Sequence, residues 1–96
     1  MRWDGRTEKR VTMAIPVCLV AAEKLRPEQA ITVNVSRRGA RVRTRRRWQP
    51  EEQPRLASNS GQTLAQAQVV YCESLPDGHF YVGLTFHPAF IEWEPI

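Results

Sequence analysis

The sequence has little of what membrane-embedded and disulfide-stabilised proteins depend on. Its longest apolar run, residues 13–22, contains Pro16 and is far shorter than the roughly 20 residues that a membrane-spanning helix needs. The first residues are charged and lack the apolar core of a signal peptide. Only two cysteines are present, Cys18 and Cys72, too few for a disulfide framework. We therefore expect a cytoplasmic protein with reduced thiols and no membrane insertion.

Catalytic and metal-binding motifs are also missing. The chain has no Gly-rich phosphate loop, no Cys-x-x-Cys pair, no His-Glu-x-x-His and no nucleophile elbow. Its two histidines, His79 and His87, stand at the two ends of one predicted strand, where ordinary polar residues are common. Because no base, nucleophile and metal ligands can be put together, we expect a binding module, not an enzyme, with no catalytic residues, no metal and no cofactor.

Lysine is scarce, and arginine takes its place. Twelve of the 14 basic residues are Arg. The guanidinium group of Arg can bind a phosphate through two parallel hydrogen bonds and can stack on flat rings. Residues 1–47 carry 13 Lys and Arg against four Asp and Glu, whereas residues 48–96 carry one against six. The formal net charge of +4 is therefore the sum of +9 in the first half and −5 in the second, and the excess of arginine in the first half favours an anionic, planar ligand.

Period-two hydrophobic patterns indicate strands in the first half of the chain. In residues 11–20 the apolar side chains alternate onto one face, and Pro16 indicates an edge or a bulge. A second strand carries Ile31, Val33 and Val35 and ends at Ser36. Gly39, tolerant of positive φ, then allows a tight turn. In the third strand the inward and outward residues alternate in the order Ala40, Arg41, Val42, Arg43, Thr44 and Arg45.

The second half continues the same pattern. Residues 46–63 read as a connection with one short strand at residues 55–58, and residues 63–73 as a strand rather than a helix. A turn at residues 76–78 leads to a hairpin strand with its apolar residues facing inward, namely Phe80, Val82, Leu84 and Phe86. After Pro88 the tail is compatible with one short helical turn. Five or six short strands without exposed edges predict an all-β fold, a small antiparallel barrel.

Two short motifs lie beside the first three strands. Arg6 and Arg10 stand four positions apart, an R-x-x-x-R pattern just before the first strand. Asn34, Ser36 and Gly39 form N-x-S-x-x-G at the turn between the second and third strands, 24 positions after Arg10. Together with a closing strand of the V-G-x-x-F type at residues 82–86, these motifs resemble the PilZ domain family. The resemblance covers about residues 5–88.

The resemblance implies a six-stranded antiparallel β-barrel that binds the bacterial second messenger cyclic di-GMP. In that interpretation residues 1–10 are a flexible basic arm with the first motif, and residues 11–96 are a single barrel domain. Arginine can donate hydrogen bonds to guanine or to phosphate, and an Asn oxygen can accept hydrogen bonds from the N–H groups on the other edge of guanine. A glycine lets the backbone approach the purine. The expected ligand-binding residues are Arg6, Arg10, Asn34, Ser36 and Gly39, with Arg37 and Arg38 at variable positions of the pattern.

Several alternatives stay open from the sequence. Arg37 and Arg38 can contact phosphate or point into water, and the stripe from Arg41 to Arg47 can be a solvated face or a partner surface. A protein adaptor with weak or no nucleotide binding is one other function, and a downstream protein partner is expected in either case. A barrel that binds single-stranded nucleic acid is less favoured, because no aromatic residues are interleaved with the arginines. Like charge at the turn should hold the arm away until ligand binds.

Overall fold

The structure, a computed structural model of the chain, describes residues 10–21, 27–87, 91 and 93. Seven strands and no helix occur among these residues. The strands are β1 (Val11–Thr12), β2 (Pro16–Val20), β3 (Glu28–Ser36), β4 (Gly39–Thr44), β5 (Arg55–Ser58), β6 (Thr63–Ser74) and β7 (Phe80–Phe86).

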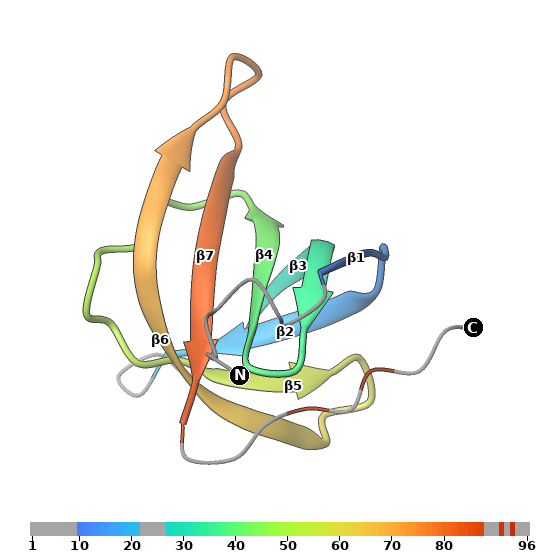
Figure 1. Cartoon of the computed structure of the whole chain (residues 1–96). Coiled ribbons are helices and arrows are strands. Elements are labelled where there is room, and N and C mark those ends of the chain that lie inside the picture. Colours follow the sequence, from blue (N-terminus) through green and yellow to red (C-terminus); the bar gives the residue numbers. More distant parts are fainter. Residues whose placement is uncertain (1–9, 22–26, 88–90, 92, 94–96) are drawn as a thin grey trace, which may run out of the picture.

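Six of the strands close into an antiparallel barrel (Figure 1). In the order β3, β2, β5, β6, β7, β4 each strand is hydrogen-bonded to the next, and β4 pairs back to β3. The remaining strand, β1, pairs with β3 beyond the stretch that β2 occupies. The prediction of an all-β, six-stranded antiparallel barrel is confirmed.

The first predicted strand is broken in two. Between β1 and β2 the side chain of Thr32 takes over part of the hydrogen bonding: its Oγ1 accepts from the Ile15 N–H at 2.8 Å and donates to the Met13 carbonyl, beside a backbone bond of 3.0 Å from the Thr32 N–H to the Ile15 carbonyl. Pro16, which has no N–H, opens β2. The prediction of one continuous strand over residues 11–20 is therefore wrong, and Val11 is exposed rather than part of the core.

A β-bulge in β3 changes which of its side chains reach the core. The register between β3 and β4 shifts between Thr32 and Asn34, so that Val33 is the extra residue. An extra residue reverses the in-and-out alternation on one side of it. Thr32 and Val35 are consequently both buried, whereas Ile31 is 40% exposed.

The other strands lie where the sequence predicts them. In β4 the buried side chains are Ala40, Val42 and Thr44, and the arginines face outward. The short strand β5 and the long strand β6 both form, and three of the four predicted inward residues of β7 are buried, whereas Phe80 is half-buried. The largest buried side chain is Trp48, which is 1% exposed. Trp48 is therefore a core residue.

Several predictions fall on residues that the structure does not describe. The N-terminal arm up to residue 9, which includes Arg6, is one of them. The helical turn after Pro88 is another. The two cysteines are described, and both are unpaired.

Candidate ligand-binding site

The two sequence motifs meet at one edge of the barrel. Val11 and Thr12 of β1 pair with Val35 and Asn34 of β3, and this register brings Arg10, the residue before β1, up to the end of β3. There the Arg10 Nη1 donates a hydrogen bond of 2.7 Å to the Asn34 Oδ1. Arg10 is exposed, so its remaining donors face solvent. The expectation that like charge holds the arm away does not apply to Arg10.

Ser36 and Gly39 close the turn that follows β3. The Ser36 hydroxyl donates to the Gly39 carbonyl at 3.3 Å, and the Ser36 carbonyl accepts from the Trp93 indole N–H at 2.7 Å. Ser36 is only 8% exposed. Its hydroxyl hydrogen is thus used within the turn, which leaves the oxygen lone pairs as the group available for other contacts.

The reason for glycine at position 39 differs from the predicted one. Gly39 is not among the residues with positive φ, so the turn does not need its conformational freedom. A Cβ at this position would lie 2.6 Å from the Leu84 carbonyl oxygen of β7. Gly39 is therefore required by the close approach of the β4 and β7 backbones.

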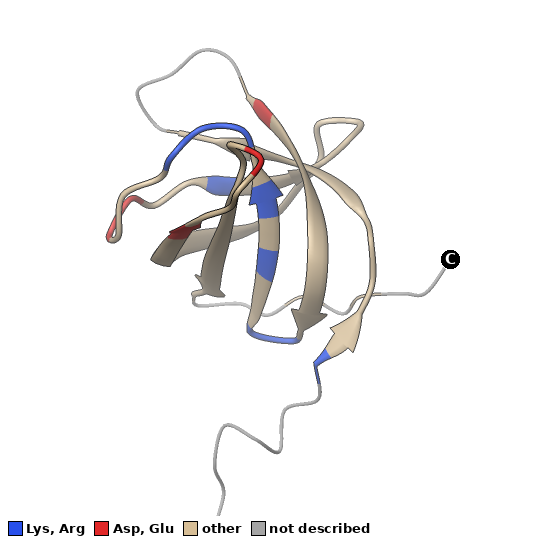
Figure 2. Ribbon diagram, turned by 90° about the horizontal axis from the view of Figure 1, so that it is seen from above, with Lys and Arg blue, Asp and Glu red and all other residues tan. Residues whose placement is uncertain are grey.

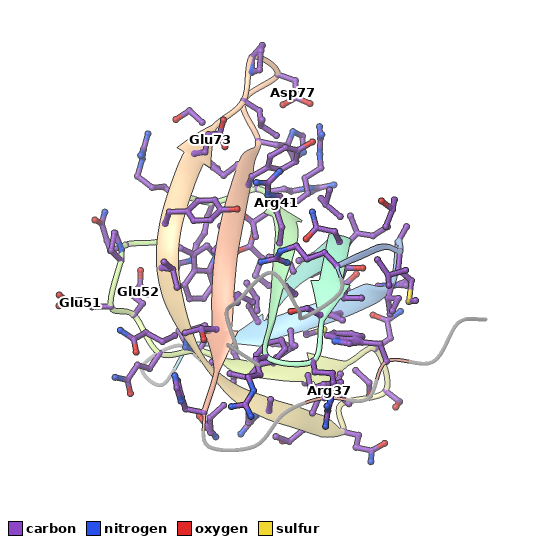
Figure 3. All side chains as sticks on the ribbon, viewed as in Figure 1. Arg37, Arg41, Glu51, Glu52, Glu73 and Asp77 are labelled. Atoms are coloured by element: carbon purple, nitrogen blue, oxygen red, sulfur yellow. The ribbon has the colours of Figure 1, made fainter. Side chains whose placement is uncertain are left out.

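Arg37 and Arg38 form the exposed tip of the turn. Their carbonyl groups anchor the C-terminal segment: that of Arg37 accepts from the Ile91 N–H, and that of Arg38 from the Phe86 N–H, both at 2.9 Å. Both residues are exposed. Figure 3 shows Arg37 at this end of the barrel, well separated from Arg41 further along β4.

Basic residues gather along β4 and the connections at both of its ends (Figure 2). Beyond Arg41, most of the stripe is tied to neighbouring groups. Arg43 forms an ion pair with Asp77, and Arg46 pairs with Glu52 at 3.2 Å while lying 3.6 Å from the centre of the Trp48 ring. Arg47 donates to the Ser74 hydroxyl at 3.1 Å. These arginines stabilise the connections of the barrel.

An aromatic pair beside Arg41 was not found from the sequence. The Arg41 Nε donates to the Tyr71 hydroxyl at 2.7 Å, and the guanidinium carbon lies 5.8 Å and 5.3 Å from the ring centres of Tyr71 and Tyr81. The hydrogen bond to Tyr71 raises the pKa of Arg41 above its usual value. The prediction that no aromatic residues lie among the arginines is therefore wrong for the folded sheet. The rings come from strands that are distant in the sequence but adjacent to β4 or one strand further on in the barrel.

A cleft lies away from the motif residues. It measures about 740 Å³ and opens at the C-terminal end of β4 and the start of β3. Its lining contains Glu28, Ile31, Arg45 and Trp48 but none of the motif residues that the structure describes. Within the described ranges no three His, Cys, Asp or Glu side chains are grouped to hold a metal ion, and no helix is long and apolar enough to cross a membrane.

Comparison with known families agrees with this barrel. The model of the PilZ domain family matches residues 4–90, which span the barrel and both motifs. PilZ domains are binding domains without catalytic activity, and in general they act as receptors for cyclic di-GMP. No curated protein sequence matches the chain significantly. Since the match extends over almost the whole sequence, this chain belongs to the PilZ domain family.

Proposed function

We propose that this chain is a signalling receptor that binds cyclic di-GMP on the outer face of the barrel, where β1, β3 and the turn before β4 meet. The observation that carries the proposal is the contact between Arg10 and Asn34. These residues belong to different motifs, 24 positions apart in the sequence, and fold into one polar surface.

The groups at this surface suit the chemistry of the ligand. Cyclic di-GMP has two phosphodiesters and two guanines, so it needs cationic donors together with groups that recognise a purine edge. Arg10 supplies an exposed guanidinium, and the Asn34 oxygen keeps a second lone pair for a guanine N–H. Ser36 would contribute an oxygen, and Arg37 and Arg38 would contribute charge at the rim.

Arg6 completes the first motif, and the proposal assigns it a phosphate or a guanine contact. This assignment rests on the R-x-x-x-R pattern alone, because Arg6 lies outside the described residues. The proposal also includes a downstream protein partner that recognises the ligand-bound form. The exposed turn at Arg37 and Arg38 is the surface beside the proposed site where such a partner would bind.

Binding of a single-stranded nucleic acid is the second candidate, favoured by one observation. Tyr71 and Tyr81 flank Arg41 on the outer face, and aromatic rings beside cations are what a stacking platform requires. The two functions differ in their response to salt. A polyanion held at several phosphates loses affinity steeply as salt rises, whereas a ligand with two phosphates loses it only gently.

Calorimetric titration with cyclic di-GMP, GTP and a short oligonucleotide tests the proposal. We expect cyclic di-GMP to bind most tightly at about 150 mM salt. Arg10→Ala should weaken its binding at least about tenfold, because a charge-assisted hydrogen bond contributes roughly 1.5–3 kcal/mol. Arg55→Ala is the matched control, since Arg55 is an exposed arginine on β5, a strand that does not adjoin β3 or β4.

Two results would contradict the proposal. The first is the absence of detectable heat with cyclic di-GMP at tens of micromolar protein. The second is tighter binding of the oligonucleotide than of cyclic di-GMP, with a steep dependence on salt, which would establish the nucleic-acid function instead.

A further inference from the structure

Arg41 lies in one row with the proposed site across the outer face of the sheet. It is paired with Asn34 of β3 on one side and with Gly83 of β7 on the other, and Gly83 is paired with Tyr71 of β6. Adjacent strands are about 4.8 Å apart. Arg41 therefore projects from the strand next to Asn34, within the span of a ligand that covers both residues.

The guanidinium of Arg41 is held in place by aromatic side chains. Its Nε is fixed by the Tyr71 hydroxyl at 2.7 Å, and the ring centres of Tyr71 and Tyr81 lie within 6 Å of the guanidinium carbon. An arginine that is already oriented loses less rotamer entropy when it binds a ligand.

The local backbone is built to place Tyr71 there. The register between β6 and β7 shifts between Val69 and Tyr71, so Val70 is a bulged residue and Tyr71 is turned to the outer face. The Tyr71 ring then covers Gly83, where a Cβ would lie only 2.1 Å from the ring. Gly83 on β7 and the bulge at Val70 on β6 thus position the Tyr71 ring, and Tyr71 in turn orients Arg41.

Within the described ranges Arg41 differs from Arg43 and Arg46 in having no carboxylate within ion-pair distance, and the charge of Glu73 acts on it only from further away. Arg43 pairs with Asp77, and Arg46 pairs with Glu52, so their charges are largely neutralised. In the described part of the chain Arg41 makes no ion pair, and its only hydrogen bond uses Nε. Both Nη groups remain available as a fork of donors.

We propose that Arg41 is a further ligand-binding residue that recognises the second guanine of cyclic di-GMP. The inference rests on the proposed function, in which the motif residues hold the first guanine and the phosphates. The two Nη donors match the O6 and N7 acceptors on the Hoogsteen edge of guanine. Adenine presents a donor in place of O6, so one arginine donor would face another donor. Arg41 thus selects guanine over adenine at the second base.

The test uses cyclic di-GMP and the mixed cyclic GMP–AMP dinucleotide, which has the same phosphodiesters but one adenine. The unaltered chain should bind cyclic di-GMP at least about tenfold more tightly than the mixed dinucleotide, the discrimination typical of a bidentate arginine–guanine pair. Arg41→Ala should weaken cyclic di-GMP binding to the level of the mixed dinucleotide and leave the latter within about twofold.

Two further variants separate this role from a structural one. Tyr71→Phe keeps the ring and removes the hydroxyl, so it should reduce the preference for cyclic di-GMP less than Arg41→Ala does. Arg43→Ala is the matched control on the same strand and should leave the preference unchanged, because Arg43 is engaged by Asp77. Circular dichroism of each variant establishes that the barrel is folded.

The outcomes distinguish the inference from the proposed function. If the unaltered chain binds neither dinucleotide, the proposed function fails and this inference fails with it. If the unaltered chain binds cyclic di-GMP but Arg41→Ala has no effect, or weakens both dinucleotides equally, the assignment of guanine recognition to Arg41 is wrong while the proposed function stands.

Discussion

Glu28 connects the core of the barrel to the segment after β4. Replacing it by a residue of the same size should therefore lower the stability of the fold strongly. Its carboxylate accepts the Trp48 indole N–H at 2.8 Å on Oε1 and the backbone N–H groups of Arg45 and Arg46 at 2.7 Å and 3.0 Å on Oε2. The side chain is 16% exposed. One carboxylate thus fixes the largest core side chain and the connection after β4.

Glu28→Gln keeps the size of the side chain and removes its charge. An amide has one acceptor oxygen, so either the Trp48 donor or the two backbone donors must face its NH₂ group. A hydrogen bond to a charged group contributes roughly 1.5–3 kcal/mol, and a buried donor left unsatisfied costs about 1–3 kcal/mol. We expect the free energy of unfolding to fall by about 3 kcal/mol, which in a domain of this size lowers Tm by roughly 12–24 °C.

Thermal unfolding followed by far-UV circular dichroism measures this loss. Glu73→Gln is the control, because the Glu73 side chain is exposed and makes no hydrogen bond within the described part of the chain, and its charge acts on Arg41 only from a distance. Its Tm should stay close to that of the unaltered chain. If Glu28→Gln melts within about 2 °C of Glu73→Gln, the carboxylate does not hold Trp48 and the connection in the way described.

Two more predictions concern stability. Gly39→Ala should cost about 1–3 kcal/mol in a urea titration, because its Cβ would meet the Leu84 carbonyl oxygen at 2.6 Å; an unchanged midpoint would show that the strands separate easily. For Asp77, the hydrogen bond from the His79 N–H, followed by the charge of Arg43, lowers the pKa of the carboxyl. Its ionised form therefore stabilises the fold above about pH 4 and this stability is lost as the pH falls through the lowered pKa. Asp77→Asn should accordingly lie below the unaltered chain in Tm at pH 7, and the difference should shrink as the pH falls below the lowered pKa of Asp77; a difference that does not change with pH would contradict the assignment.

The sequence is sufficient to predict the class of fold and most of the strands. In β4 the alternation of Ala40, Val42 and Thr44 with arginines matches their burial, because a strand of a closed barrel has one face in the core and one in solvent. The strands of the second half follow from the same periodicity. Both ligand motifs are also visible in the sequence, and the barrel brings Arg10 and Asn34 into contact.

The details that the sequence does not reveal are those that depend on partners distant in the chain. The bulges at Val33 and Val70 carry no distinctive local residues, yet they decide that Ile31 faces outward and that Tyr71 reaches Arg41. The split of the first strand depends on the side chain of Thr32. Its hydroxyl accepts a hydrogen bond from the amide of Ile15, which lies 17 positions earlier in the sequence. Period-two patterns describe one strand at a time, so they contain no information on these contacts.

The central claim is that cyclic di-GMP binds on the outer face at β3, β4 and the turn between them, and not in the cleft at the other end of β4. An amide NMR titration with cyclic di-GMP tests it directly. We predict that the largest chemical-shift changes fall on residues 34–41 and on residues 83–85 of β7, which pair with this part of β4. Changes concentrated instead on residues 28–31, 43–46 and 48, which line the cleft, would contradict the account.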